Sequence, residues 1–220
     1  MKLNPSKPIL YLITRGATTE ATTVDSPEFK QIKAQVSAAV AAEIDLVQLR
    51  EKRLSARVLF ELTRQAFALT RGTATRLLVN DRADIAAAVG ADGVHLTTRS
   101  IDVPTVRRTF GSEVLIGVST HSIAEARTAK DAGADFVVFG PVFDTAAKRA
   151  YGTPVGIAEL SRVTRELADF PVLALGGIAM ENFARCLNSG ARGIAGIGLF
   201  SEPQELRNIT AQIKEWSHMR

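Results

Sequence analysis

Three polar side chains stand at the end of one apolar run in the sequence. Residues 46–52 read LVQLREK, so the apolar run gives way to Gln48, Arg50 and Lys52 at alternating positions. Strand alternation sends Gln48 and Arg50 to one face and leaves Lys52 at the strand end. Two cations and an amide directed at one opening suit a polyanion such as pyrophosphate. A solvated cluster of surface charges is the alternative explanation.

Asn80 and Asp81 form a second polar pair, directly after the apolar run RLLV. Either residue has the type that caps a helix, and either can be a metal or substrate ligand. A carboxylate beside a pyrophosphate site is the usual means of holding Mg²⁺, which prefers oxygen ligands together with substrate phosphates. Asp81 is therefore the candidate metal ligand.

A further rim of polar residues contains Ser119 and His121, in the segment GVSTHS. His121 is a candidate general acid and base, because an ordinary imidazole titrates near neutral pH. A helix-start residue satisfied by a hydroxyl is an equal alternative. His95 lies inside the short run GVHL, which predicts a packed and hydrogen-bonded core histidine.

Glycines follow the last two apolar runs, in Gly176-Gly177-Ile178 and in Gly196-Ile197-Gly198. Glycine turns expose backbone N–H groups, which bind phosphate at the ends of late barrel strands. The polar segment 140–152 has the length of a lid or substrate loop.

The elements that must position these residues are eight short apolar runs, which alternate with amphipathic segments of helical periodicity. The runs cover residues 9–14, 46–50, 76–80, 93–96, 114–120, 136–143, 171–177 and 193–200. Eight such alternations predict a single (β/α)8 TIM barrel domain over residues 1–220. A doubly wound open sheet is the alternative fold. Gly-Ala-Asp recurs before two of the runs, as GADGV and GADFV, where the glycine ends a helix.

Composition narrows the classes of partner. The chain has 27 Lys and Arg against 23 Asp and Glu, without a basic run, so small anions are favoured over nucleic acid. No apolar stretch of ~18 residues and no signal-like start is found, so we expect a cytoplasmic protein without membrane contact. The single Cys186 is expected to be a buried structural thiol.

Seven segments together resemble a known family. QLREK, NDRADIA, GADGVHL, GVSTHS, GADFVVFGPVFDTAAKR, PVLALGGI and GARGIAGI have the order and spacing of thiamin phosphate synthases and TenI-type thiazole tautomerases. The match covers roughly residues 9–200, and its specificity lies in the whole set. The resemblance implies a transferase of thiamin biosynthesis, which joins hydroxymethylpyrimidine pyrophosphate to thiazole phosphate, releases pyrophosphate and uses Mg²⁺.

The resemblance also implies a role for each candidate residue. Asp81 would hold Mg²⁺, and Lys148 would reach the pyrophosphate from the long loop. The pyrimidine pyrophosphate would lie against Gln48, Arg50, Lys52, Asn80 and Ser119. The thiazole phosphate would face Thr145, Gly177, Ile197 and Gly198.

Departures from the synthase pattern bear on the reaction. Ser100 stands where synthases carry a second metal-binding Asp, and Ala147 replaces a loop Thr. Asp102 could replace the missing ligand only if the turn were rearranged. The first strand runs into Thr14 where the family commonly has Asp. TenI-type proteins resemble the chain in the Arg-Ser pair after the fourth strand and in the SxHSxxEA segment, whose His is implicated in their proton transfer. The resemblance would make His121 the acid–base residue of this chain.

Three functions therefore stand at this point. A transferase comes first because its pyrophosphate set is nearly complete. A metal-independent thiazole phosphate tautomerase comes second, and a non-catalytic barrel that binds thiamin precursors comes third. The assembly is left open, with a homodimer among the choices.

Overall fold

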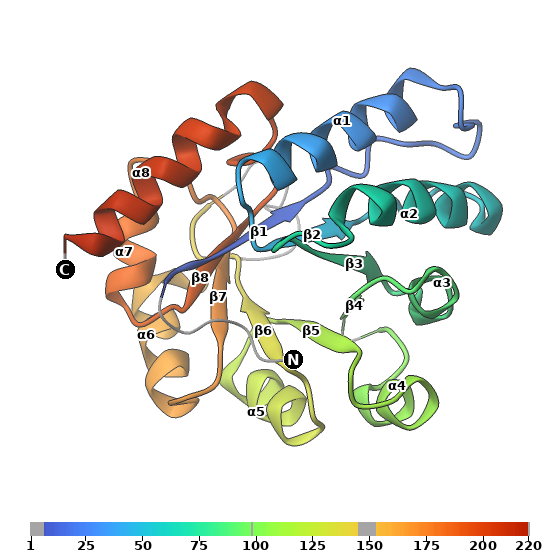
Figure 1. Ribbon diagram of the computed structural model, residues 1–220. Coiled ribbons are helices and arrows are strands. Elements are labelled where there is room, and N and C mark those ends of the chain that lie inside the picture. Colours follow the sequence, from blue (N-terminus) through green and yellow to red (C-terminus); the bar gives the residue numbers. More distant parts are fainter. Residues whose placement is uncertain (1–6, 98, 145–152, 220) are drawn as a thin grey trace.

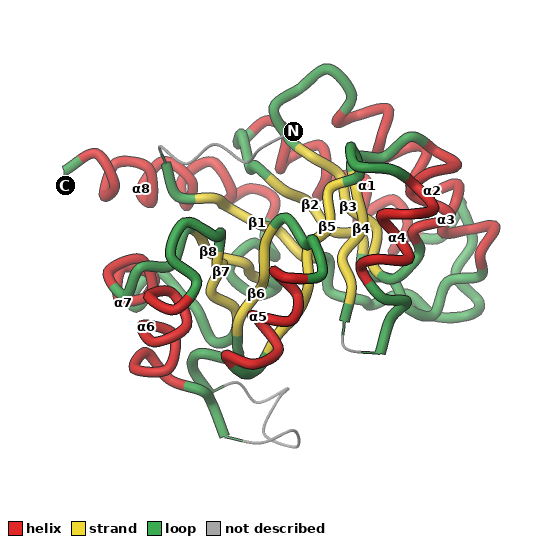
Figure 2. The backbone as a smooth tube through the Cα atoms, turned by 90° about the horizontal axis from the view of Figure 1, so that it is seen from below, coloured by secondary structure: helices red, strands yellow, loops and turns green. Residues whose placement is uncertain are grey.

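The protein is a closed barrel of eight parallel strands, each followed by helical structure. The computed structural model describes residues 7–97, 99–144 and 153–219. The strands pair in chain order, and β8 returns to pair with β1. Figure 1 shows the strands at the centre and the helices outside them, and Figure 2 shows the same arrangement from below. The predicted TIM barrel is confirmed, and the open sheet is wrong because the two edge strands are hydrogen-bonded to each other.

Strands and helices alternate along the described residues. The strands are β1 (Ile9–Ile13), β2 (Leu46–Leu49), β3 (Arg76–Asn80), β4 (Gly93–Leu96), β5 (Leu115–Thr120), β6 (Phe136–Phe139), β7 (Val172–Leu175) and β8 (Gly193–Gly196). The helices are α1 (Pro27–Ala41), α2 (Ala56–Thr70), α3 (Ala83–Val89), α4 (Val103–Phe110), α5 (Ile123–Asp131), α6 (Gly156–Glu166), α7 (Phe183–Asn188), the 3-10 helix η2 (Pro203–Glu205) and α8 (Leu206–His218).

All eight apolar runs contain a strand, but several strands end earlier than expected. β6 ends at Phe139 instead of residue 143, and β7 ends at Leu175 instead of residue 177. Gly176 and Gly177 both have positive φ, which turns the chain out of the sheet. Apolar residues beyond the strands, such as Val142, are nevertheless buried, so hydrophobicity alone overestimates strand length.

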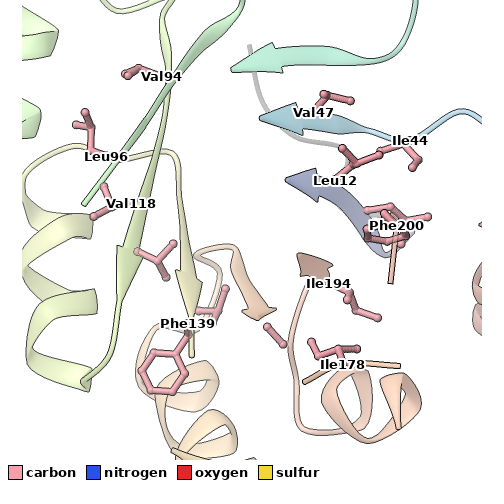
Figure 3. Close-up of a cluster of buried hydrophobic side chains, with 14 of the residues drawn as sticks. Leu12, Ile44, Val47, Val94, Leu96, Val118, Phe139, Ile178, Ile194 and Phe200 are labelled. Atoms are coloured by element: carbon pink, nitrogen blue, oxygen red, sulfur yellow. The ribbon is translucent and has the colours of Figure 1, made fainter. Parts of the chain in front are cut away.

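The core has two layers, because strands of a parallel barrel are buried on both faces. The barrel interior contains Tyr11, Leu46, Leu78, Phe136 and Leu173, together with other inward residues. A second layer lies between the strands and the helices, where Leu12, Val47, Val94 and Ile194 are found; Figure 3 shows part of it. Alternate residues of one strand therefore serve different layers, as Tyr11 and Leu12 of β1 do.

The repeated aspartates at strand starts have a structural role. Each accepts a hydrogen bond from a backbone N–H of the preceding strand. The bonds are Leu10 N to Asp45 Oδ2 (2.9 Å), Leu77 N to Asp92 Oδ2 (2.9 Å) and Ile116 N to Asp135 Oδ2 (2.7 Å). Each carboxylate also pairs with a cation, in Lys7–Asp45, Arg76–Asp92 and Arg107–Asp135. These aspartates fasten strand pairs at the amino ends of the strands, opposite the expected site.

Cys186 is fully buried in α7, and burial raises the pKa of its thiol to about 11, as expected of a structural cysteine. Across residues 7–97, 99–144 and 153–219, no helix combines the length and apolarity needed to span a bilayer.

Candidate active site

A cavity of about 800 Å³ opens at the carboxyl ends of the strands. It brings together every sequence-predicted site residue that the structure describes, from five different strands or the turns after them. These residues are Gln48, Arg50, Lys52, Asn80, Asp81, Ser119, His121, Gly177, Ile197 and Gly198. Thr145 and Lys148, and with them Ala147, lie outside the described residues.

A row of hydrogen-bonded side chains lies beside the cavity on β2 and β3. Gln48 Nε2 donates to Asn80 Oδ1 at 3.0 Å, and Asn80 Nδ2 donates to Asp81 Oδ2 at 2.7 Å. A carboxylate only accepts, so Asn80 must turn its amide nitrogen to Asp81 and its oxygen to Gln48. This order leaves Gln48 Oε1 buried and without a partner in the described part of the chain. An unsatisfied buried acceptor costs about 1–3 kcal/mol, which a ligand N–H donor could offset.

Asp81 is held from both sides by protein donors. Ser100 Oγ donates to its Oδ1, while Asn80 occupies Oδ2. Ser100 itself accepts from the backbone N of Thr97 at 2.7 Å. Asp81 has a φ of 60° and donates its backbone N–H to His95 O, and it lines the cavity. Ser100 stands where synthases carry a second metal-binding Asp, and it contacts the Asp81 carboxylate.

The described residues do not by themselves form a magnesium site. Asp81 is the only carboxylate among the described residues that line the cavity, and its oxygens already accept hydrogen bonds. No group of three His, Cys, Asp or Glu suited to a metal occurs among the described residues. Asp102 does not replace the missing ligand, because it caps α4 by accepting from Thr105 N at 2.7 Å and lies outside the cavity lining. The hydrogen bond from the Thr105 backbone, and a further one from the Thr105 side chain, lower the pKa of the Asp102 carboxyl.

Positive charge gathers on the same side of the cavity. Arg50 and Lys52 line it from the end of β2, and Arg99 lines it from the turn after β4. Sequence reasoning had noted the Arg-Ser pair only as a family resemblance and had missed Arg99 as a site residue. Three cations around one opening favour a polyanionic ligand group.

Glu51, between two of these cations, faces away from the cavity. Its buried carboxylate accepts from Thr14 Oγ1 at 2.6 Å, from Gly16 N at 3.1 Å and from Thr18 Oγ1 at 2.7 Å. Thr14 Oγ1 in turn accepts from Arg50 N at 2.8 Å. Glu51 therefore fixes the segment after β1 against the end of β2. The alternation that sends Gln48 and Arg50 inward also places residue 51 on the other face, and this was the signal that could have separated it from the charge cluster.

His95 is a core histidine, as predicted, and also part of the cavity lining. Its side chain is 2% exposed and hydrogen-bonded through both ring nitrogens, to Tyr11 and Ser119. Desolvation, with a smaller contribution from the Arg50 charge, lowers the pKa of His95 to about 3. The imidazole is therefore neutral at physiological pH.

The lowered pKa of His95 predicts acid-sensitive stability. Between the unfolded value of ~6.5 and the folded value of about 3, the unfolded chain binds a proton that the folded chain rejects, so the free energy of unfolding decreases as pH falls. The His95 side chain lowers the free energy of unfolding by about 2 kcal/mol between pH 7 and pH 5. Urea unfolding at both pH values should show that His95→Gln reduces the pH dependence by about this amount. His218→Gln, at the exposed end of α8, is the matched control, and an equal effect of the two variants would contradict the assignment.

His121 lies at the rim, just before α5. Ser122 caps this helix by accepting from Glu125 N at 3.2 Å, and His121 donates its backbone N–H to Glu125 Oε2. The imidazole contacts the Gly140 carbonyl through Nδ1 at 2.5 Å. A carbonyl only accepts, so Nδ1 carries the hydrogen and Nε2 is left as the basic nitrogen. His121 is thus a helix-start residue with a hydrogen-bonded ring, as the structural alternative predicted, but the partner is a carbonyl oxygen and not a hydroxyl.

The glycine turns after β7 and β8 lie across the barrel from the cations. Asn182 supports the first turn, because its side chain accepts from Ala179 N and donates to Gly177 O, both at 2.9 Å. A Cβ on Gly177 would lie 2.7 Å from Phe143 Cβ and 2.8 Å from Asp144 O. A side chain at 177 would therefore disturb the segment after β6 whether or not ligand is bound. Gly198 differs, since an added Cβ would have nothing within 4 Å.

Gly198→Ala is the clean probe of ligand approach to these turns. We expect an unfolding free energy within ~0.5 kcal/mol of wild type, because the methyl group meets no protein atom. Thiazole phosphate affinity should fall roughly 10-fold if its phosphate approaches this backbone closely. Calorimetric titration and urea unfolding measure the two quantities. Gly177→Ala should instead lose stability, and unchanged affinity in Gly198→Ala would remove the β8 turn from the phosphate site.

Comparison with known proteins identifies the family of the chain. The family described as thiamine monophosphate synthase matches residues 10–200. A putative thiamine-phosphate synthase from Geobacter sulfurreducens is 48% identical over 166 residues, covering 76% of this chain and 78% of the relative. A thiamine-phosphate synthase from Chlorobium phaeobacteroides is 35% identical over 214 residues, covering 96% and 97% of the two chains.

A solved structure is similar over almost the whole barrel. The thiamine phosphate pyrophosphorylase from Pyrococcus furiosus superposes with a TM-score of 0.75 at 29% identity, covering 95% of this chain and 98% of that one. With its polar strand ends gathered around one cavity and the family match covering nearly all of the barrel, the chain belongs to the thiamine monophosphate synthase family.

Proposed function

We propose that the protein condenses hydroxymethylpyrimidine pyrophosphate with thiazole phosphate, releasing pyrophosphate and forming thiamin phosphate. The observation that carries this proposal is one cavity with cationic side chains at one end and glycine turns at the other. Arg50, Lys52 and Arg99 stand at the ends of β2 and β4, and the glycine turns follow β7 and β8. Two phosphorylated substrates can then lie with their rings between these ends. The names of the curated relatives support the same reaction.

In this reaction the bond between the pyrimidine methylene carbon and the pyrophosphate oxygen breaks, and the thiazole nitrogen bonds to that carbon. The leaving group takes the electron pair of the broken bond. Arg50 and Lys52 stabilise the charge that collects on the pyrophosphate, and fixed charges of this kind need little rearrangement during the reaction. The unpartnered Gln48 Oε1 would accept a hydrogen bond from an amino group on the pyrimidine. The remaining task of the site is to hold both rings in contact.

Magnesium, which the resemblance implies for a synthase, has one candidate protein ligand among the described residues, Asp81. When bound, Mg²⁺ would supply further positive charge to the pyrophosphate. Each Asp81 oxygen accepts one hydrogen bond, from Ser100 or Asn80, and keeps a second lone pair that could bind the ion. Because the ion would have a single protein carboxylate among the described residues, the cationic side chains carry the proposed stabilisation.

A second function is favoured by two specific observations. Ser100 leaves the rim with one carboxylate, and His121 lines the cavity with its Nδ1 held by the Gly140 carbonyl, so that Nε2 is the nitrogen available for proton transfer. A tautomerase of carboxythiazole phosphate needs one acid–base group and a phosphate anchor, without a pyrophosphate or metal.

The deciding experiment is a steady-state assay of the purified protein with both substrate sets, each with Mg²⁺ and with EDTA. Thiamin phosphate formation supports the condensation, and its absence together with carboxythiazole turnover would replace it by the tautomerase. Tight thiazole phosphate binding without either turnover would indicate a non-catalytic binding barrel.

A further inference from the structure

Three hydrogen-bonded side chains lead from the barrel interior to the cavity. The Tyr11 hydroxyl of β1 lies 3.1 Å from His95 Nδ1 on β4. His95 Nε2 lies 2.9 Å from Ser119 Oγ on β5, and Ser119 lines the cavity. We call Tyr11, His95 and Ser119 the interior triad.

Packing holds the two inner members in one orientation. Tyr11 is 0% exposed, and its ring centroid lies 5.7 Å from that of His95. Phe136 contacts both rings, at 5.6 Å from Tyr11 and 6.1 Å from His95. Gly117 provides the space, since a Cβ there would lie 2.8 Å from His95 Nδ1. A ring flip of His95 would therefore require the surrounding core to move.

The direction of the hydrogen bonds follows from counting donors. A neutral imidazole has one N–H donor and one acceptor nitrogen, whereas an imidazolium would carry a hydrogen on both nitrogens. The buried Tyr11 hydroxyl has only His95 Nδ1 as a partner in the described part of the chain. If Nδ1 carried the hydrogen, the tyrosine hydrogen would be buried without an acceptor, at a cost of about 1–3 kcal/mol. Tyr11 therefore donates to Nδ1, and the imidazole hydrogen must be on Nε2.

We propose that Tyr11 and His95 are positioning residues that make Ser119 a hydrogen-bond donor to the ligand. Because Ser119 Oγ accepts from His95 Nε2–H, its own hydrogen is left to point into the cavity. It would donate to an acceptor atom, either a pyrimidine ring nitrogen or a phosphate oxygen. The cavity wall would then offer a ligand one donor, the Ser119 hydroxyl, and one acceptor, Gln48 Oε1. The identity of the ligand rests on the proposed function, whereas the direction of the donors rests on the triad itself.

The direction can be measured in the free protein. Nitrogen-15 NMR of histidine-labelled protein at pH 7 should show His95 as the neutral Nε2–H tautomer. Tyr11→Phe removes the donor to Nδ1 and should shift population towards the Nδ1–H form. Leu46→Val, elsewhere in the same interior cluster, should leave the tautomer unchanged. An Nδ1–H tautomer or an imidazolium in the wild type would overturn the proposal.

A double-mutant cycle tests the consequence for binding. Tyr11→Phe should weaken hydroxymethylpyrimidine pyrophosphate binding about 5-fold in the wild type but less than about 2-fold in Ser119→Ala. Equal losses in the two backgrounds would mean that Tyr11 acts only through general packing and would overturn the proposal. Repeating the cycle with inorganic pyrophosphate and with free hydroxymethylpyrimidine identifies which acceptor Ser119 contacts. If the wild type binds none of these probes, the proposed substrate fails, while the NMR result still decides the donor direction.

Discussion

Arg50→Ala is expected to weaken binding of hydroxymethylpyrimidine pyrophosphate by about 100-fold, because a guanidinium–phosphate contact is charge-assisted and bidentate. The structure supports a direct role, since Arg50 lines the cavity next to Lys52. The hydrogen bond from Arg50 to Thr14 Oγ1 uses the backbone N–H of Arg50, which alanine retains. Calorimetric titration with the substrate measures the loss, and urea unfolding should remain within ~1 kcal/mol of wild type.

Arg53→Ala is the matched control for this variant. Arg53 follows in the same turn and is exposed, but it does not line the cavity. Its removal should leave substrate affinity within about 2-fold of wild type, since it only changes long-range charge. Equal losses of substrate affinity in Arg50→Ala and Arg53→Ala would mean that the charges after β2 are only a solvated surface cluster.

His121→Asn is expected to separate the two candidate reactions. Asparagine keeps a hydrogen-bonding group near the Gly140 carbonyl but cannot act as an acid or base, a contribution normally worth ~10² to 10⁴ in rate. Carboxythiazole tautomerisation should lose this factor, whereas condensation should remain within about 10-fold, because its barrier lies in the departure of pyrophosphate. Steady-state kcat for each substrate set provides the measurement.

Ser100→Asp complements the histidine variant by adding a second carboxylate beside Asp81. A synthase should gain in activity and in Mg²⁺ dependence, since two carboxylates and a pyrophosphate form the usual ligand set. A tautomerase should stay flat or lose activity, because the new charge repels an anionic substrate. Carboxythiazole turnover that collapses in His121→Asn, together with no condensation in the wild type or in Ser100→Asp, would overturn the first proposal.

Much of the barrel could be predicted because its signals are local. Each apolar run is short and separated by amphipathic segments, so eight strands and their order follow from periodicity. The rule that barrel sites form at carboxyl strand ends then places Gln48, Asn80 and Ser119 at one mouth before any contact is known. Strand length was less predictable, because Val142 is as buried as a strand residue while Gly176 turns the chain away.

The roles of individual polar residues needed more than their position. Asp102 has the type and location of a metal ligand, yet the helix that starts after it uses its carboxylate as a cap. Glu51 belongs to a charged motif, yet its carboxylate accepts hydrogen bonds from the segment after β1. His95 was correctly assigned to the core, but its place in the cavity lining followed only from the barrel interior being continuous with the site.

Sequence by itself determined which residues stand at the strand ends, because in-out alternation and turn chemistry act over a few neighbouring positions. Only the tertiary structure decided which of them are bonded to one another. Tyr11 and His95 are separated by 84 positions, and Asp81 and Ser100 by 19, so their contacts depend on strand register and on closure of β8 against β1. A hydrogen bond forms over about 3 Å and in one direction, and that degree of placement arises only when the whole barrel is packed.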